Sequence, residues 1–120
     1  MSDDTRFLKG LNNYKKLSGN DENIFEPLGD LGKLMLEYGF GDIYGRDTLS
    51  WKERQISTMS IQIANGYLPQ FKLHVKFSLN IGISIEEIEE LIIHCSAYTG
   101  FPAVMNAYNA LKDVKTELGI

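Results

Sequence analysis

The chain has 120 residues, of which 16 are acidic and 12 are basic, so its formal net charge at pH 7 is -4. This length suits one ordinary domain, and such a chain buries roughly two-thirds of its unfolded surface on folding. The negative balance provides no cationic surface for a phosphate backbone, which argues against a nucleic-acid partner. We therefore expect a single domain over residues 1–120 that does not bind nucleic acid.

The N-terminal sequence, the lack of long apolar runs and the cysteine content favour the cytoplasm. The N-terminus is polar and acidic, and no apolar run approaches the roughly 18 residues that a membrane span requires. One cysteine, Cys95, cannot form an intramolecular disulfide, and no Cys/His spacing is typical of a metal site. We expect a cytoplasmic protein with no membrane partner, no metal and no organic cofactor.

Apolar residues recur at helical spacing in the first half of the chain. One set predicts a short N-terminal helix: Phe7, Leu11, Tyr14 and Leu17. A second set predicts a helix with Pro27 in its first turn: Leu28, Leu31, Met35 and Tyr38. We expect Gly39 and Gly41 to end that helix, and a loop to follow from Phe40 to Leu49.

Capping signals divide the second half into four further helices. Ser50 and Glu53 have capping-box spacing, which predicts a third helix that runs to about Asn65-Gly66. Pro69 favours the start of a fourth helix, which Gly82 ends. Its expected buried stripe is Phe71, Val75 and Leu79.

Ser84 and Glu87 repeat the capping box and begin a fifth helix, and Pro102 begins a sixth. The stripe of the fifth helix is Ile88, Leu91, Ile92 and Cys95, and that of the sixth is Ala103, Ala107, Ala110 and Val114. The expected fold is all-α, a helical bundle of about six helices. Surplus apolar residues in 34–36 and 101–108 predict that another subunit covers them, so we expect an oligomer.

Several short motifs between residues 40 and 102 form a recognisable set: Phe40-Gly41-Asp42-Ile43-Tyr44, Leu49, Arg54, His74, Gly82, Glu87-Ile88, Glu90 and Tyr98-Thr99-Gly100-Phe101-Pro102. Together they resemble the carboxymuconolactone decarboxylase family of the alkylhydroperoxidase D-like superfamily. The resemblance covers roughly residues 25–112. It implies an all-α fold, assembly as a trimer or hexamer, and either decarboxylase or thiol-peroxidase chemistry.

The peroxidase branch of this superfamily implies residues that the chain lacks. Its two cysteines lie seven and four residues before the histidine that His74 resembles, and its glutamate lies nineteen before it. Those positions hold Tyr67, Gln70 and Gln55. Because peroxide reduction requires a reactive thiolate and a resolving thiol, a peroxidase is the least favoured function. Cys95 does not compensate, since it falls on an apolar stripe.

The decarboxylase branch fits better, with His74 as the general acid. An imidazole has an unperturbed pKa of about 6.5 and can deliver a proton to the carbanion that the loss of carbon dioxide leaves. We predict Gln70, one helical turn earlier, and Gln55 as its catalytic partners. Arg54 is predicted to bind a substrate carboxylate, and the alternative is that it ties helices together.

Tyr67 and Tyr98 complete the expected substrate-binding residues, and the expected partner is a small carboxylated metabolite. Family members commonly hold a glutamate where this chain has Gln55, and an amide cannot shuttle protons at neutral pH. A divergent, noncatalytic oligomer that binds a small acid therefore remains the alternative to a carboxy-lyase.

Overall fold

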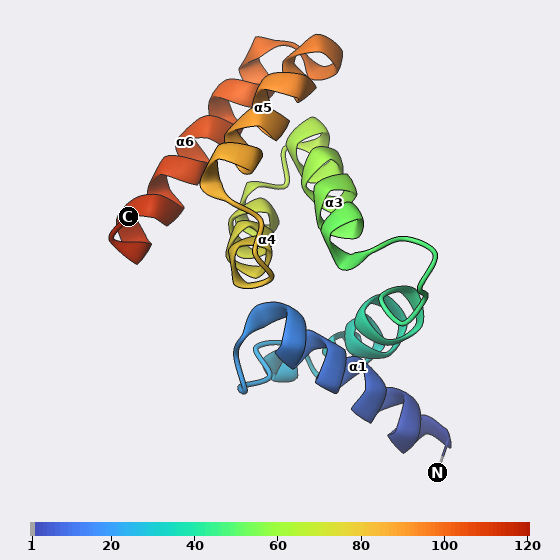
Figure 1. Ribbon diagram of the computed structural model, residues 1–120. Helices are drawn as coiled ribbons and strands as arrows, with labels where there is room; N and C mark the ends of the chain where they lie inside the picture. The colour runs from blue at the N-terminus through green and yellow to red at the C-terminus, as the bar shows by residue number, and fades with distance from the viewer. Residues whose placement is uncertain (1) are drawn as a thin grey trace. The chain divides into compact units, whose positions relative to one another are not determined.

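The computed structural model describes residues 2–120, with side chains from Thr5 onward, and every regular element in that range is a helix. The elements are α1 (Ser2–Ser18), η1 (Glu26–Leu28), α2 (Asp30–Leu34), η2 (Met35–Ile43), α3 (Trp51–Asn65), α4 (Leu68–Asn80), α5 (Ile85–Thr99) and α6 (Phe101–Leu118) (Figure 1). The expected all-α fold with about six helices is therefore confirmed. The chain forms two compact units, an N-terminal unit up to Trp51 and a C-terminal unit from Lys52 to Ile120.

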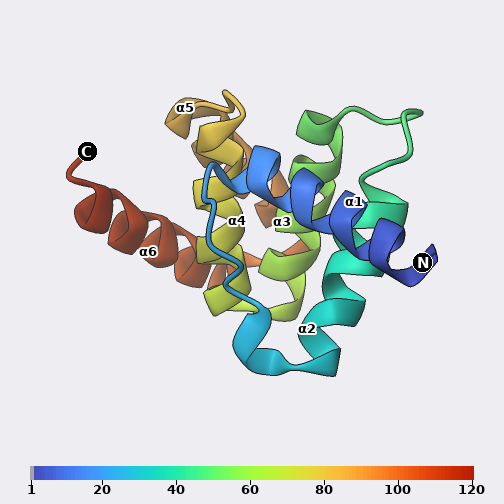
Figure 2. The same ribbon diagram turned by 90° about the horizontal axis from the view of Figure 1, so that it is seen from below.

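In the N-terminal unit, α1 packs closely against η2 (Figure 2). Gly10 of α1 is buried, and a Cβ atom at this position would lie 2.0 Å from the carbonyl oxygen of Leu36. Only a glycine permits that approach of two backbones. Beside it, the rings of Tyr14, Phe25 and Phe40 pack with centroids 5.4 to 5.6 Å apart. Backbone contact and aromatic packing together hold this unit.

Three elements, η1, α2 and η2, replace the single second helix that was predicted, with a break at Gly29. A nine-residue π-helix, η2, runs through Gly39 and Gly41 to Ile43, so the prediction that these glycines end the helix is wrong. The predicted stripe is also wrong as a buried face, since its four residues are exposed: Leu28, Leu31, Met35 and Tyr38. The wider turn of a π-helix shifts residues around the axis, and Leu36 and Phe40 are buried instead.

In the C-terminal unit, the predicted helix boundaries agree with the structure. Ser84 Oγ accepts the backbone N–H of Glu87 at 3.1 Å, and the Glu87 carboxylate accepts the N–H of Ser84 at 3.0 Å. A hydrogen bond from Lys52 and the Ser84 amide lower the pKa of Glu87. The capping box predicted for α5 is thus confirmed, and Gly82 follows α4 with a φ of 97°.

The core of the C-terminal unit follows the predicted stripes. In α5 the four stripe residues are buried: Ile88, Leu91, Ile92 and Cys95. They pack with Phe71 and Val75 of α4 and with the small side chains of α6, Ala107 and Ala110. These small residues allow α5 and α6 to lie side by side (Figure 1). Over residues 2–120, no helix combines the length and the apolar character needed to cross a membrane.

Candidate functional site

A hydrogen bond inside the C-terminal unit joins two of the predicted site residues. His74, on α4, places its Nδ1 atom 3.1 Å from Oε1 of Gln55, on α3. Gln55 is fully buried and His74 is partly buried. An amide oxygen only accepts hydrogen bonds, so Nδ1 carries the proton in this pair. The second ring nitrogen, Nε2, then holds the lone pair of a neutral imidazole.

A third residue, Ser78, which was not among the predicted site residues, also bonds to Gln55. Ser78 Oγ donates to the same Gln55 Oε1 at 3.2 Å, and it lies 3.6 Å from the sulfur of Met59. Ser78 is fully buried on α4, four residues after His74. This spacing puts both side chains on one helix face, so helical periodicity from His74 would have identified it.

The surroundings of the imidazole keep it uncharged. Its ring meets that of Phe77 edge to face, with centroids 5.0 Å apart. Burial lowers the pKa of His74 from 6.5 to about 4, because a charged imidazolium loses its water there. At neutral pH His74 is therefore a neutral base in the resting protein.

The other predicted site residues lie in different surroundings. Gln70 is exposed in the first turn of α4, and Tyr67, just before that helix, is 54% exposed. Tyr98 is 80% exposed and packs against the ring of His94 at 5.3 Å. In the part of the chain that the structure describes, no hydrogen bond joins these three residues to His74.

Arg54 lies on α3 beside Gln55 in the sequence and is half-buried. Side chains of adjacent residues in a helix point about 100° apart, so the Arg54 side chain lies on a different face of α3 from the Gln55 side chain. The structure thus brings Gln55 and His74 together, and it adds Ser78 to them.

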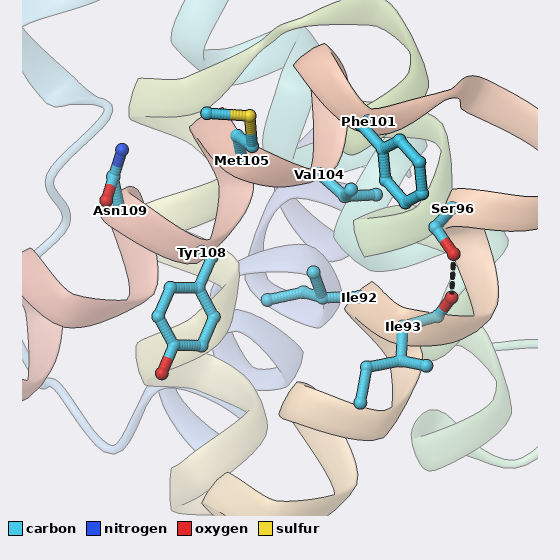
Figure 3. A pocket seen from close by; sticks show the side chains of 8 residues that line it. All are labelled: Ile92, Ile93, Ser96, Phe101, Val104, Met105, Tyr108 and Asn109. Carbon is cyan, nitrogen blue, oxygen red and sulfur yellow. Dashed lines mark hydrogen bonds between the residues drawn. The ribbon is translucent and has the colours of Figure 1, made fainter.

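A separate hollow lies between α5 and α6, with a volume of about 520 Å³. Figure 3 shows Ile92, Ile93 and Ser96 of α5 facing Phe101 and Tyr108 of α6. Ser96 turns its hydroxyl back to the carbonyl of Ile93 at 2.6 Å, so it presents no free donor to the hollow. The lining is mainly apolar and does not include His74.

The single thiol, Cys95, is buried in α5 at 4% exposure. It borders a smaller hollow of about 300 Å³ with residues of α3. Among the residues that the structure describes, no cluster of three or more His, Cys, Asp or Glu side chains has the arrangement of a metal site. The hydrogen-bonded pair of His74 and Gln55 is accordingly the arrangement with the clearest acid–base chemistry.

Comparison with known proteins identifies the class of protein. The pattern of the carboxymuconolactone decarboxylase family matches residues 29–113, which is well over half of the chain. The chain belongs to this family. The predicted resemblance is therefore confirmed.

Named relatives narrow the range of chemistry within the family. The 4-carboxymuconolactone decarboxylase of Acinetobacter baylyi is 28% identical over 126 aligned positions, which cover 100% of this chain and 94% of that protein. The nitrosuccinic acid decarboxylase npaB of Metarhizium robertsii is 28% identical over 62% of this chain and 52% of that protein. An uncharacterized 15.0 kDa protein of Paracoccus denitrificans is 33% identical over 69% of this chain and 63% of its own length. Two of these three relatives are named as enzymes that remove a carboxyl group.

Proposed function

We propose that the protein is a carboxy-lyase that acts on a small carboxylated lactone or a similar acid, with His74 as the residue that protonates carbon. The observation that supports this most is the hydrogen bond between His74 Nδ1 and the buried Gln55 Oε1, in a family whose relatives include two named decarboxylases. This bond fixes the imidazole and leaves Nε2 as the nitrogen able to exchange a proton with a ligand.

The reaction consumes one proton in each turnover. The bond between the substrate carbon and its carboxylate breaks, carbon dioxide leaves, and the electron pair spreads over the unsaturated lactone as a dienolate. A carbon atom of the dienolate then takes a proton. The protein must therefore hold an anion and deliver one proton to carbon.

In this proposal, neutral His74 takes up the proton when the substrate binds. A substrate carboxylate near Nε2 favours the charged imidazolium and raises the pKa of His74 above its resting value of about 4. The proton comes from solvent, while Nδ1–H keeps its bond to Gln55. The amide does not compete for this proton, so His74 can pass it to the dienolate carbon.

Other residues bind and orient the substrate in this proposal. The permanently charged guanidinium of Arg54 suits a second carboxylate, and Gln70 and Tyr67 lie one and two helical turns before His74 in the chain. Tyr98 is the weakest of the proposed binding residues, because its ring packs against His94.

A noncatalytic protein that binds a small acid is the second candidate, and Gln55 is the observation that favours it. A glutamate at this position could exchange protons with His74, whereas an amide cannot. Such a protein would bind the acid at the same site but would not catalyse its decarboxylation.

The test is the release of carbon dioxide from 4-carboxymuconolactone by the purified protein, against the spontaneous rate. Turnover by the wild type supports the carboxy-lyase. If the wild type is inactive and Gln55→Glu is active, the presence of glutamine at position 55 has removed the catalytic activity of the site. If neither variant turns over but calorimetry detects lactone binding, the binding protein is the correct function.

We also propose that the protein self-associates through the hollow between α5 and α6. Phe101 is 72% exposed there, and Ile93 and Met105 are each 62% exposed (Figure 3). Apolar side chains grouped in this way usually mark an interface, and an aromatic anchor is typical of its centre. We expect sedimentation to show a trimer or hexamer at micromolar concentration and Phe101→Asp to weaken it. A wild type that sediments only as a 13.6 kDa monomer would refute this interface.

A further inference from the structure

We infer that Ser78 is a positioning residue that selects the proton-bearing nitrogen of His74 through the orientation of the Gln55 amide. The inference rests on the proposed function for the importance of His74, but the hydrogen-bond arrangement itself does not. Three side chains from two helices form the arrangement: Gln55 from α3, and His74 and Ser78 from α4.

The Gln55 amide has two possible orientations toward this pair. With Oε1 inward, as observed, the oxygen accepts from both Ser78 Oγ and His74 Nδ1. With the NH₂ group inward, Gln55 would donate to both, and His74 Nδ1 would have to be the lone-pair nitrogen. The amide orientation and the tautomer of His74 are therefore linked.

The hydroxyl of Ser78 favours the first orientation. If the NH₂ group faced inward, Ser78 Oγ would accept from it and would need another acceptor for its own proton. The sulfur of Met59, at 3.6 Å, is the acceptor that the structure places there. A thioether is a weak acceptor and an amide oxygen is a strong one, so donation to Oε1 is preferred.

Burial strengthens the preference for the amide orientation in which Oε1 faces Ser78 and His74. Gln55 and Ser78 are both fully buried, so water does not substitute for a missing partner. The ring of His74 is also held edge to face against Phe77 at 5.0 Å, which limits its rotation. The hydroxyl of Ser78 thus leaves Nε2, and not Nδ1, as the nitrogen available to a ligand.

The test measures the tautomer directly, in the absence of any substrate. The protein contains two histidines, so ¹⁵N NMR of the ring nitrogens at pH 7 needs only His94→Gln to assign the signals of His74. We expect the Nδ1–H form to predominate in the wild type. In Ser78→Ala the ratio of Nδ1–H to Nε2–H should fall by about threefold to tenfold, the effect of one net hydrogen bond.

Three further variants control for altered packing. Ser60→Ala removes a half-buried hydroxyl that bonds only the carbonyl of Ile56 on its own helix, and it should leave the ratio unchanged. Met59→Leu removes the acceptor that Ser78 would use in the opposite amide orientation, so it should raise the ratio or leave it as it is, and should not lower it. Ser78→Thr restores a hydroxyl and should recover most of the wild-type ratio.

A wild type in which Nε2–H predominates would overturn the inference. So would a ratio in Ser78→Ala within twofold of the wild type. If the carboxy-lyase is active, Ser78→Ala should lower kcat in proportion to the Nδ1–H population that is lost, which is a smaller factor than the change in the ratio, with KM unchanged. A wild type without turnover but with the expected tautomer shift would refute the proposed function and leave this inference standing.

Discussion

The two units of the molecule are both helical, but different parts of the chain hold them together. In the N-terminal unit, backbone meets backbone where Gly10 lies against the carbonyl of Leu36, and a π-helix sets the angles of the side chains. In the C-terminal unit, a capping box begins α5, a glycine with positive φ follows α4, and apolar stripes fill the core around the polar Gln55 and Ser78. Side-chain packing can be read from residue spacing, whereas the close approach of two backbones cannot.

The largest effect on stability that we expect comes from the polar part of the C-terminal core. Unfolded His74 binds a proton near pH 6.5, whereas the folded residue binds one only near pH 4. Between these values the unfolded state holds more protons, so stability falls as the pH falls through this window. Full passage from pH 6.5 to below pH 4 should cost on the order of 3 kcal/mol through His74.

Urea unfolding at several pH values, followed by circular dichroism, checks this dependence. His74→Gln should lose this part of the pH dependence, and His94→Gln, at an exposed position, should retain it. If wild type and His74→Gln lose stability in parallel between pH 6.5 and 4, His74 is not held neutral by burial.

The next largest effect tests the backbone contact of the N-terminal unit. Gly10→Ala would place a methyl group 2.0 Å from the Leu36 carbonyl oxygen, so the two helices must move apart. We expect a loss of about 2 kcal/mol in unfolding free energy, measured by urea denaturation. Gly39→Ala is the matched control, because no atom lies within 4 Å of its Cβ position. Equal stability of the two variants would contradict the close approach.

A smaller effect tests the capping box at the start of α5. Ser84→Ala removes the hydroxyl that accepts the Glu87 N–H, and it should destabilise the protein by about 1 kcal/mol in thermal or urea unfolding. Ser96→Ala, in the same helix, removes a hydroxyl bonded to the carbonyl of Ile93 and should change stability by less than about 0.5 kcal/mol. A Ser84→Ala variant as stable as Ser96→Ala would show that the cap contributes little.

The same contrast explains how far the sequence predicts this structure. Ser84, Gly82 and the stripe through Ile88 and Cys95 act locally, so the boundaries and core of α5 are predicted correctly. The stripe from Leu28 to Tyr38 fails because no single α-helix carries it. Leu28 lies in the 3₁₀ helix η1 and Leu31 in the short α2, while Met35 and Tyr38 lie in the π-helix η2, to which the 3.6-residue period does not apply. The single domain predicted for residues 1–120 stays a prediction.

For the site, the sequence identifies His74 and Gln55, nineteen residues apart, through the family resemblance. Ser78 is missing from that set because it belongs to none of the family motifs, although its place four residues after His74 on the same helix face was a usable signal. Gln70, Tyr67, Arg54 and Tyr98 remain predicted site residues. Whether a side chain contacts a substrate depends on a bound conformation that residue spacing does not encode.

The most direct test of His74 as the proton donor compares carbon dioxide release from 4-carboxymuconolactone by wild type, His74→Gln and His94→Gln. Glutamine at position 74 retains a neutral hydrogen-bonding group but cannot donate a proton to carbon. We expect His74→Gln to lose about 10²- to 10⁴-fold in kcat, while His94→Gln keeps the wild-type rate. An active wild type whose His74→Gln variant retains kcat within a few-fold would show that His74 is not the proton donor.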